Sequence, residues 1–198
     1  DAADGLFYNP AQGGLADIER SKYLPDGSAS GMPRHVDLFC QRAPLLALTT
    51  LLAAGELSAQ SRLHRLVSGL AAISQREGNE ISFPTYRWAP VLKPQWYAGA
   101  VPPERWLGYR YALLTGLARY VEITGDAEAA DLALGLARYY IHRGDVPPDG
   151  RFCANTRSGG VLPTTAGIAR LAAWSGDRQM LDWTQRVYTW VREQIPDF

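Results

Sequence analysis

A repeated helix–turn–helix pattern limits the fold of this chain more than any other feature of its sequence. Thr124-Gly125-Asp126 and Ser175-Gly176-Asp177 each end an apolar segment with helical periodicity, and the two tripeptides are 51 residues apart. The same distance separates Asp131 from Asp182, and Ala54-Gly55-Glu56 is a weaker copy of the turn. In such a turn the glycine adopts the left-handed conformation that ends one helix, and the acidic residue caps the next by accepting from its free N–H groups. The pattern predicts an all-α chain of antiparallel helical hairpins.

The apolar periodicity after residue 35 predicts six helices, which pair into three hairpins over residues 35–198. The predicted helices cover residues 36–54, 63–76, 103–124, 127–142, 163–174 and 178–195. Pro44 is expected to kink the first helix or to mark a second start. Residues 80–86 alternate in polarity and predict one short β segment inside a long loop, whereas residues 1–34 are expected to be irregular. We therefore expect one helical domain over residues 1–198, or a fragment of a larger one.

The connections between hairpins differ from the turns within them. Residues 78–102 and 144–160 form long connections, and a long irregular connection in a compact domain usually carries function. Because successive helices alternate in direction, we expect the tight turns at one end of the bundle and the long connections at the other. Acidic residues near the tight turns are then explained by capping, and His64 and His142, which lie on helices, by solvation or packing.

Composition and charge exclude several functional classes. The 198 residues include 20 basic and 20 acidic ones without a basic cluster, which excludes a strongly basic nucleic-acid-binding protein. The longest nearly apolar run, residues 43–54, is too short to cross a bilayer. No zinc-site spacing, phosphate-binding loop or dinucleotide fingerprint is present, so neither a metal nor a cofactor is expected. Free thiols are the default expectation for Cys40 and Cys153, with a disulfide as the alternative.

The hairpin pattern of residues 36–195 resembles that of the (α/α)-toroid carbohydrate-active enzymes, which comprise six-hairpin glycosidases and related polysaccharide lyases and epimerases. The resemblance rests on hairpins that end in Thr-Gly-Asp or Ser-Gly-Asp and continue into a helix that contains an aspartate. It implies a carbohydrate substrate and part of a toroid, since a complete toroid has more hairpins than the three expected here. The absence of an initiator methionine also favours a segment of a longer chain, whose remainder would complete the ring.

Aromatic and cationic side chains gather in the long connections and are the candidates for substrate binding. Aromatic rings suit the apolar faces of sugars, and Arg and Asn side chains suit their hydroxyl or carboxylate groups. The candidates are Tyr86, Arg87, Trp88, Trp96, Tyr97, Tyr109, Asn155 and Arg157. Trp88 and Trp96 are the favoured platforms, with packing of the loop onto the helices as the alternative role of these rings.

Glu80, Asp149 and Asp37 are the candidate catalytic carboxylates, because all three lie toward the long connections. Hydrolysis of a glycosidic bond needs two carboxyl groups that face each other about 5 to 9.5 Å apart. Glu80 follows directly on the aromatic connection, whereas Asp149 belongs to a Pro-Pro-Asp-Gly segment that a turn alone would explain. Glycoside hydrolysis is the first functional expectation.

Two alternatives remain open at this point. A polysaccharide lyase or uronate epimerase would use His35 beside Asp37 as a general base, Tyr86 or Tyr109 as a proton donor, and an arginine to neutralise the uronate. A non-catalytic helical-repeat module that binds a glycan or a protein would show exposed aromatic side chains without a facing carboxylate pair.

Overall fold

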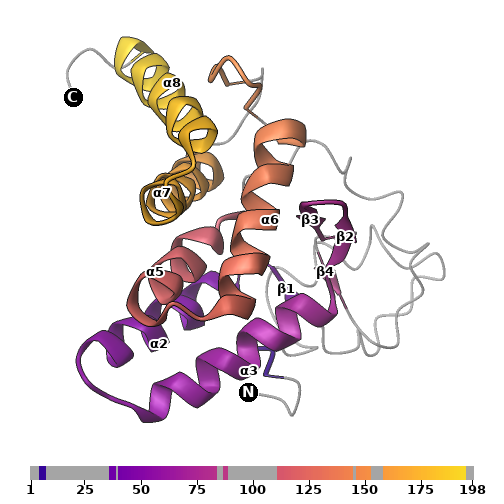
Figure 1. Cartoon of the computed structure of the whole chain (residues 1–198), viewed down its shortest axis with the longest axis vertical. Helices are drawn as coiled ribbons and strands as arrows, with labels where there is room; N and C mark the ends of the chain where they lie inside the picture. The colour runs from indigo at the N-terminus through magenta and orange to yellow at the C-terminus, as the bar shows by residue number, and fades with distance from the viewer. Residues whose placement is uncertain are drawn as a thin grey trace, which may run out of the picture.

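The computed structural model of this chain describes residues 5–7, 36–38, 40–83, 87–88, 111–144, 146–152 and 158–194. Within these residues the fold is mostly helical and contains six α-helices (Figure 1). The helices are α2 (Arg42–Ala53), α3 (Ser58–Ala72), α5 (Leu114–Thr124), α6 (Ala127–Arg143), α7 (Ser158–Ser175) and α8 (Arg178–Gln194). In the described part of the chain, no helix is both long and apolar enough to span a membrane.

The predicted helices are present, but three of them begin elsewhere. The first begins at Arg42 rather than at residue 36, so Pro44 lies in its first turn, where a missing N–H costs no helical hydrogen bond. The second, α3, begins at Ser58 rather than at residue 63, and it ends at Ala72 because Gln75–Glu77 form a strand instead of the predicted last helical turn. The fifth predicted helix, α7, begins at Ser158 and contains Pro163 in its interior instead of starting there. The predicted start of the third helix at residue 103 lies outside the described residues, and its described part is α5.

Four short strands form two separate ribbons within the described residues. β2 (Gln75–Glu77) pairs antiparallel with β3 (Glu80–Ser82), which is the start of the predicted strand at residues 80–86. β1 (Val36–Asp37) pairs antiparallel with β4 (Arg87–Trp88). The helical periodicity predicted from residue 36 is therefore wrong at β1, because Val36 is buried as part of a strand.

The three tight turns have the conformation that the sequence predicts. Gly55, Gly125 and Gly176 have φ values of +94°, +65° and +74°. The Asp126 carboxylate caps α6 by accepting from the Ala129 N–H at 2.9 Å. One repeat later, the Asp177 carboxylate accepts from the Met180 N–H at 3.1 Å, and it caps α8 in the same way. The hairpins α2–α3, α5–α6 and α7–α8 thus follow the predicted pattern.

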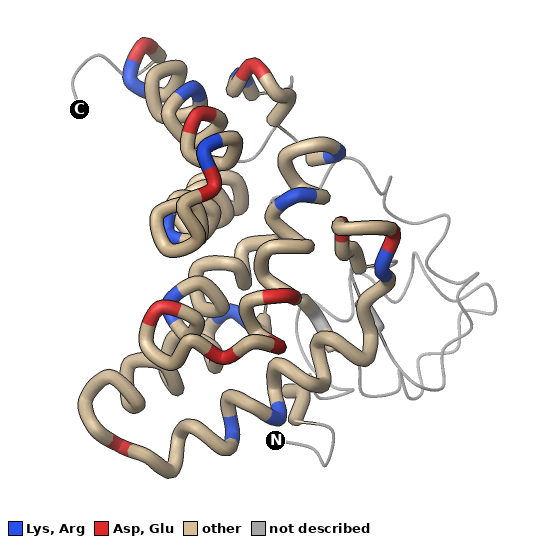
Figure 2. The backbone as a smooth tube through the Cα atoms, viewed as in Figure 1, with Lys and Arg blue, Asp and Glu red and all other residues tan. Residues whose placement is uncertain are grey.

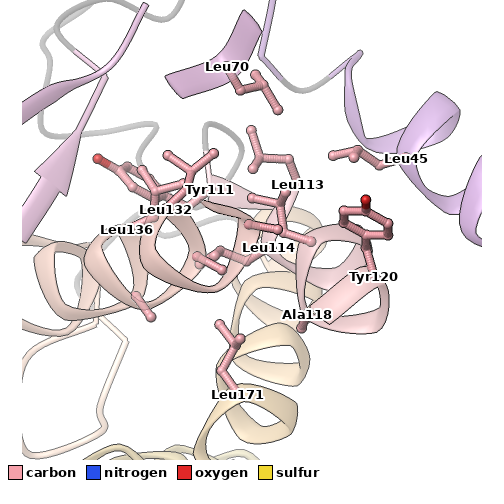
Figure 3. Close-up of a cluster of buried hydrophobic side chains, with 14 of the residues drawn as sticks. Leu45, Leu70, Tyr111, Leu113, Leu114, Ala118, Tyr120, Leu132, Leu136 and Leu171 are labelled. Carbon is pink, nitrogen blue, oxygen red and sulfur yellow. The ribbon is translucent and has the colours of Figure 1, made fainter. Parts of the chain in front are cut away.

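The first helices of the three hairpins, α2, α5 and α7, pack against one another in sequence order and form the centre of the core. Two glycines allow this close approach. A Cβ atom on Gly116 of α5 would lie 2.6 Å from the Leu45 Cβ of α2, and one on Gly167 of α7 would lie 2.6 Å from the Leu114 carbonyl carbon of α5. Figure 3 shows the buried side chains around Leu114 where these helices meet.

The third hairpin does not follow the predicted separation of tight turns and long connections. The α2–α3 and α5–α6 turns lie in the lower left part of Figure 1, whereas α8 lies in the upper part, packed on α7. Asp177 of the third tight turn lines the same pocket as Pro148 of the long connection and His142 at the end of α6. A tight turn and a long connection therefore meet at one place, and the candidate site lies there.

Candidate functional site

A pocket of about 210 Å³ lies where the end of α6, the β2–β3 turn, the 146–152 segment and the start of α8 come together. Its lining residues include Asn79, Arg138, His142, Pro148, Trp183 and Arg186. The volume suits a small ligand or one residue of a longer one. We call this the His142 pocket.

Glu80 and His142 form a hydrogen-bonded pair at the edge of the His142 pocket. The Glu80 Oε1 and His142 Nδ1 atoms are 2.5 Å apart, and the two side chains are 20% and 54% exposed. An ionised carboxylate only accepts hydrogen bonds, so in this contact the Nδ1–H group donates a hydrogen bond to Glu80, and in the imidazole tautomer with hydrogen on Nδ1 alone the Nε2 atom is a proton acceptor. A carboxylate that orients a histidine in this way prepares it to act as a general base.

A glycine on α6 allows the approach that makes this pair. A Cβ atom on Gly135 would lie 2.5 Å from the Ile81 Cγ1 atom, so only glycine lets β3 pack directly on the helix. Glu80 precedes the buried Ile81 on β3, and His142 follows Gly135 by two helical turns on the same face of α6. The close β3–α6 contact therefore brings the carboxylate to the imidazole.

Two arginines give the His142 pocket a cationic wall. Arg138 lies one helical turn before His142 on α6. Arg186 of α8 donates from Nε to the Pro148 carbonyl oxygen at 2.8 Å, which fixes its guanidinium beside the pocket. A guanidinium group binds a carboxylate or phosphate through paired N–H donors. The pocket thus combines a base with groups that bind an anion.

Trp183 supplies an aromatic side chain to the wall of the same pocket. Its side chain is 1% exposed, and its ring packs edge-on against Tyr140 at 6.1 Å. The buried Trp183 Nε1–H has no hydrogen-bond acceptor within the part of the chain that the structure describes.

A second, more open cleft of about 400 Å³ lies between the 146–152 segment and α8, and Arg186 borders both clefts. Its lining includes the carboxylates of Asp149, Asp182 and Glu193 together with the Trp190 ring. We call this the carboxylate cleft. The Asp149 Oδ1 atom accepts from the Arg151 N–H at 3.1 Å, an Asx-type turn contact that the turn interpretation of Asp149 predicts.

The predicted site residues are only partly brought together. Glu80 belongs to the pair at the His142 pocket, whereas Asp149 lines the carboxylate cleft. The backbones of Asp37 and Arg87 are partners in the β1–β4 ribbon, and Trp88 pairs there with Val36. The other predicted residues lie outside the described residues: Tyr86, Trp96, Tyr97, Tyr109, Asn155 and Arg157, along with His35 and Cys153.

Four residues that line the His142 pocket were not among the predicted site residues: Arg138, His142, Trp183 and Arg186. The His142 side chain is 54% exposed, in agreement with the solvation predicted for it. Its position at the end of α6, directly before the long 144–160 connection, is the sequence signal that points to this pocket. Capping explains Asp126 and Asp177, but Asp131 instead forms an ion pair with Arg76 of β2.

The described residues contain no group of three or more His, Cys, Asp or Glu side chains that could hold a metal ion. Comparison of the chain with protein families, with curated proteins and with solved structures finds no match. The arguments for function therefore come from the geometry of the two clefts.

Proposed function

We propose that this protein is a carbohydrate-active enzyme that removes a proton next to the carboxylate of a uronic-acid sugar. The observation that carries the proposal is the 2.5 Å contact between Glu80 Oε1 and His142 Nδ1 at the edge of a pocket lined by Arg138 and Arg186. This pairing favours the lyase or epimerase alternative over glycoside hydrolysis at Glu80, because the Glu80 carboxylate is engaged in orienting a base.

The reaction follows from the groups in the pocket. The arginines bind the sugar carboxylate and neutralise the negative charge that develops on it when the adjacent C–H bond breaks. His142 Nε2 takes that proton. In β-elimination the electron pair of the C–H bond forms a carbon–carbon double bond, the glycosidic C–O bond breaks, and the leaving oxygen takes up a proton. In epimerisation a proton returns to the opposite face of the same carbon.

The contacts among the first helices of the three hairpins support a toroid-type arrangement, whereas the third tight turn lies away from its predicted end. Three hairpins in sequence order, with α2, α5 and α7 in contact along the centre, are what part of an (α/α) toroid contains. We propose that the chain forms such a part and that further hairpins complete the ring.

Glycoside hydrolysis at the carboxylate cleft is the second candidate. Asp149, Asp182 and Glu193 line one cleft with Trp190, and hydrolysis requires a facing pair of carboxyl groups beside a sugar platform. This candidate uses none of the residues that define the base at His142, so the two functions are separable by mutation.

Turnover of acidic oligosaccharides tests the proposal, with neutral oligosaccharides as the matched substrates. β-Elimination is followed by the ultraviolet absorbance of the new double bond, epimerisation by deuterium uptake from solvent, and hydrolysis by new reducing ends. We expect activity on uronates alone and a loss of about 100-fold or more in His142→Gln. His64→Gln is the control, because His64 is an exposed histidine near Asp126, away from both clefts.

The outcomes distinguish the candidates. Full activity in His142→Gln would remove the proposed base. Reducing ends without unsaturated product, lost in Asp182→Asn or Glu193→Gln, would move the activity to the carboxylate cleft. Binding of oligosaccharides without any turnover would favour a glycan-binding module.

A further inference from the structure

An apolar groove of about 360 Å³ runs along the last hairpin between α7 and α8. Leu162 and Tyr188 on its walls are 44% and 63% exposed, which is unusual for large apolar side chains on neighbouring helices. The groove is lined by Leu162, Thr165, Ala166 and Ala169 of α7 and by Thr184, Gln185, Val187, Tyr188 and Val191 of α8. We call it the α7–α8 groove.

Because the repeat is 51 residues long, each residue of the groove has a counterpart 51 positions earlier, in the second hairpin. The counterparts of the α7 residues Leu162, Thr165, Ala166 and Ala169 are Tyr111, Leu114, Thr115 and Ala118. Tyr111, Leu114 and Ala118 are 0% exposed. α7 packs on α5, whereas the Tyr111 ring packs against Tyr139 and Tyr140 of α6. Gly167 of α7 closely approaches Leu114, and the Thr115 hydroxyl donates to the Pro163 carbonyl of α7 at 2.7 Å. The groove is thus the counterpart of a surface that a helix covers in the preceding hairpin.

The α8 wall of the groove gives the same result. Moved back by 51 positions, Thr184, Val187, Tyr188 and Val191 become Ala133, Leu136, Ala137 and Tyr140. All four of these α6 residues are 0% exposed, whereas on α8 Tyr188 is 63% exposed and only Thr184 and Val187 are buried. The Thr165 Oγ1 atom is buried without a hydrogen-bond partner among the described residues, at the boundary of this exposed surface. Leu162 and Tyr188 of the groove are therefore exposed at positions whose counterparts in the second hairpin, Tyr111 and Ala137, are buried.

The opposite end of the helix row exposes a face that fits this groove. α2 carries one charged residue, Arg42, and most of its tube is tan in Figure 2. The exposed residues of α2 are Ala43, Ala47, Thr50, Leu51 and Ala53, followed by the exposed C-cap Ala54, and Ala43, Ala47, Thr50 and Ala54 recur at helical spacing opposite the buried Leu45 and Leu48. A solvent-facing helix normally carries charged residues on this side, so an uncharged face of small residues indicates a partner.

Packing of α2, α5 and α7 identifies Ala47 as the contact position on that face. In each internal contact a glycine of one helix approaches a leucine of the helix before it in the row. Gly167 of α7 approaches Leu114 of α5, and Gly116 of α5 approaches Leu45 of α2. Gly116 follows Leu114 on α5 by two residues. Ala47 follows Leu45 by the same two residues, so it corresponds to Gly116 and Gly167, and it is exposed. The helices that dock in this row thus carry glycine at the close contact, and α2 carries alanine, the next smallest residue.

We infer that this chain associates head to tail with a second copy of itself, with α2 of one copy bound in the α7–α8 groove of the other and Ala47 against Thr165. The internal α2–α5 and α5–α7 contacts are continued between the copies, and both surfaces are free of charge at the contact. Such a contact uses different surfaces on the two copies, so it either closes into a ring or continues as a chain.

Sedimentation velocity of the 198-residue protein over a range of concentrations tests this inference. We expect association that Ala47→Glu and Tyr188→Glu each weaken at least about 10-fold, because each variant buries an unpaired charge at the contact. Gln60→Glu, which adds the same charge at an exposed site on α3, is the control and should associate like the unmodified chain. Circular dichroism and thermal unfolding check that every variant is folded.

Mixing the two variants gives the decisive result. Ala47→Glu keeps an intact groove and Tyr188→Glu keeps an intact α2 face, so an equimolar mixture should form heterodimers while neither variant associates alone. A mixture that stays monomeric, variants that associate like the unmodified chain, or an unmodified chain that is monomeric at all concentrations would overturn the inference. The last result would leave the groove to a hairpin from another source. Since neither residue lines the His142 pocket, the result does not depend on the proposed activity.

Discussion

Replacement of Gly167 by alanine tests the packing that places the third hairpin. A Cβ atom at this position would lie 2.6 Å from the Leu114 carbonyl carbon, 2.7 Å from the Thr115 nitrogen and 2.8 Å from the Leu114 oxygen. All three are backbone atoms of α5, so no side-chain rotation relieves the overlap and the two helices must separate. Overpacking of this kind costs about 1 to 3 kcal/mol of stability. Because the neighbouring atoms at Gly167 belong to the backbone, we expect a cost near the upper end of this range.

Helix propensity acts in the opposite direction at Gly167. Alanine in a helix interior is favoured over glycine by about 1 kcal/mol. The net expectation is therefore a loss of about 1 to 2 kcal/mol in the free energy of unfolding. For a domain of this length, this corresponds to a fall in Tm of roughly 2 to 8 °C.

Thermal and urea unfolding of Gly167→Ala measure this loss, and Ala173→Gly is the matched control. Ala173 is an exposed residue of α7, so its replacement changes propensity without a packing effect and should cost about 1 kcal/mol. A Gly167→Ala variant that unfolds at the same or a higher temperature than the unmodified chain would refute the close α5–α7 contact. It would also remove the basis for the docking geometry at Ala47.

Three further predictions concern the second hairpin and the ribbon beside it. Asp126→Ala should lower the free energy of unfolding by about 1 kcal/mol in urea titrations, because α6 loses its cap. Burial and the nearby Asp126 carboxylate raise the pKa of Tyr120 to about 12, so folding favours the neutral phenol. The stabilisation from Tyr120 is complete below about pH 10 and is lost as the pH rises towards 12. Between these pH values the free energy of unfolding should therefore fall by about 2 kcal/mol less in Tyr120→Phe than in the unmodified chain, as urea titrations at each pH would measure. The exposed Arg76–Asp131 pair should show a coupling energy below about 1 kcal/mol in a double-mutant cycle, and 1 M salt should reduce it.

The parts of the fold that the sequence predicts well are those that depend on neighbouring residues. A helix end needs a residue that tolerates positive φ, and Gly125 and Gly176 provide it. A helix start needs an acceptor for free N–H groups, and Asp126 and Asp177 provide it at both repeats. These requirements act within a few residues, so a single sequence is enough to recognise them.

The orientation of the third hairpin and the start of α7 could not be predicted in this way. Each depends on contacts between distant residues, such as the Gly167 approach to Leu114 and the hydrogen bond from Thr115 to the Pro163 carbonyl, which are 53 and 48 residues apart. The fifth predicted helix covers residues 163–174, but a full turn of helix precedes Pro163. The predicted strand at residues 80–86 is present as β3, but its partner β2 and the β1–β4 ribbon were not predicted, because strand pairing depends on residues that are distant in the sequence.

The candidate site shows why sequence patterns located it only in part. Glu80 was identified from its place beside a long connection, but its partner His142 lies 62 residues away, and Gly135 brings the two together. The site thus depends on one small residue that permits a close contact rather than on a recognisable motif. Gly135 permits the close contact between β3 and α6, and through that contact it positions Glu80 beside His142, the proposed base.

Stability and the proposed chemistry are separable at this site. The His142 side chain is 54% exposed, so its replacement removes little buried surface and should leave the unfolding transition near that of the unmodified chain. Gly135→Ala, in contrast, would force β3 away from α6 and move Glu80 from the imidazole, which alters both stability and the orientation of His142. If His142 is a base that requires the Glu80 carboxylate, both His142→Gln and Gly135→Ala lose activity. Only Gly135→Ala also lowers the stability of the protein. Equal effects of the two variants on stability and activity would mean that His142 acts through the fold and not through proton transfer.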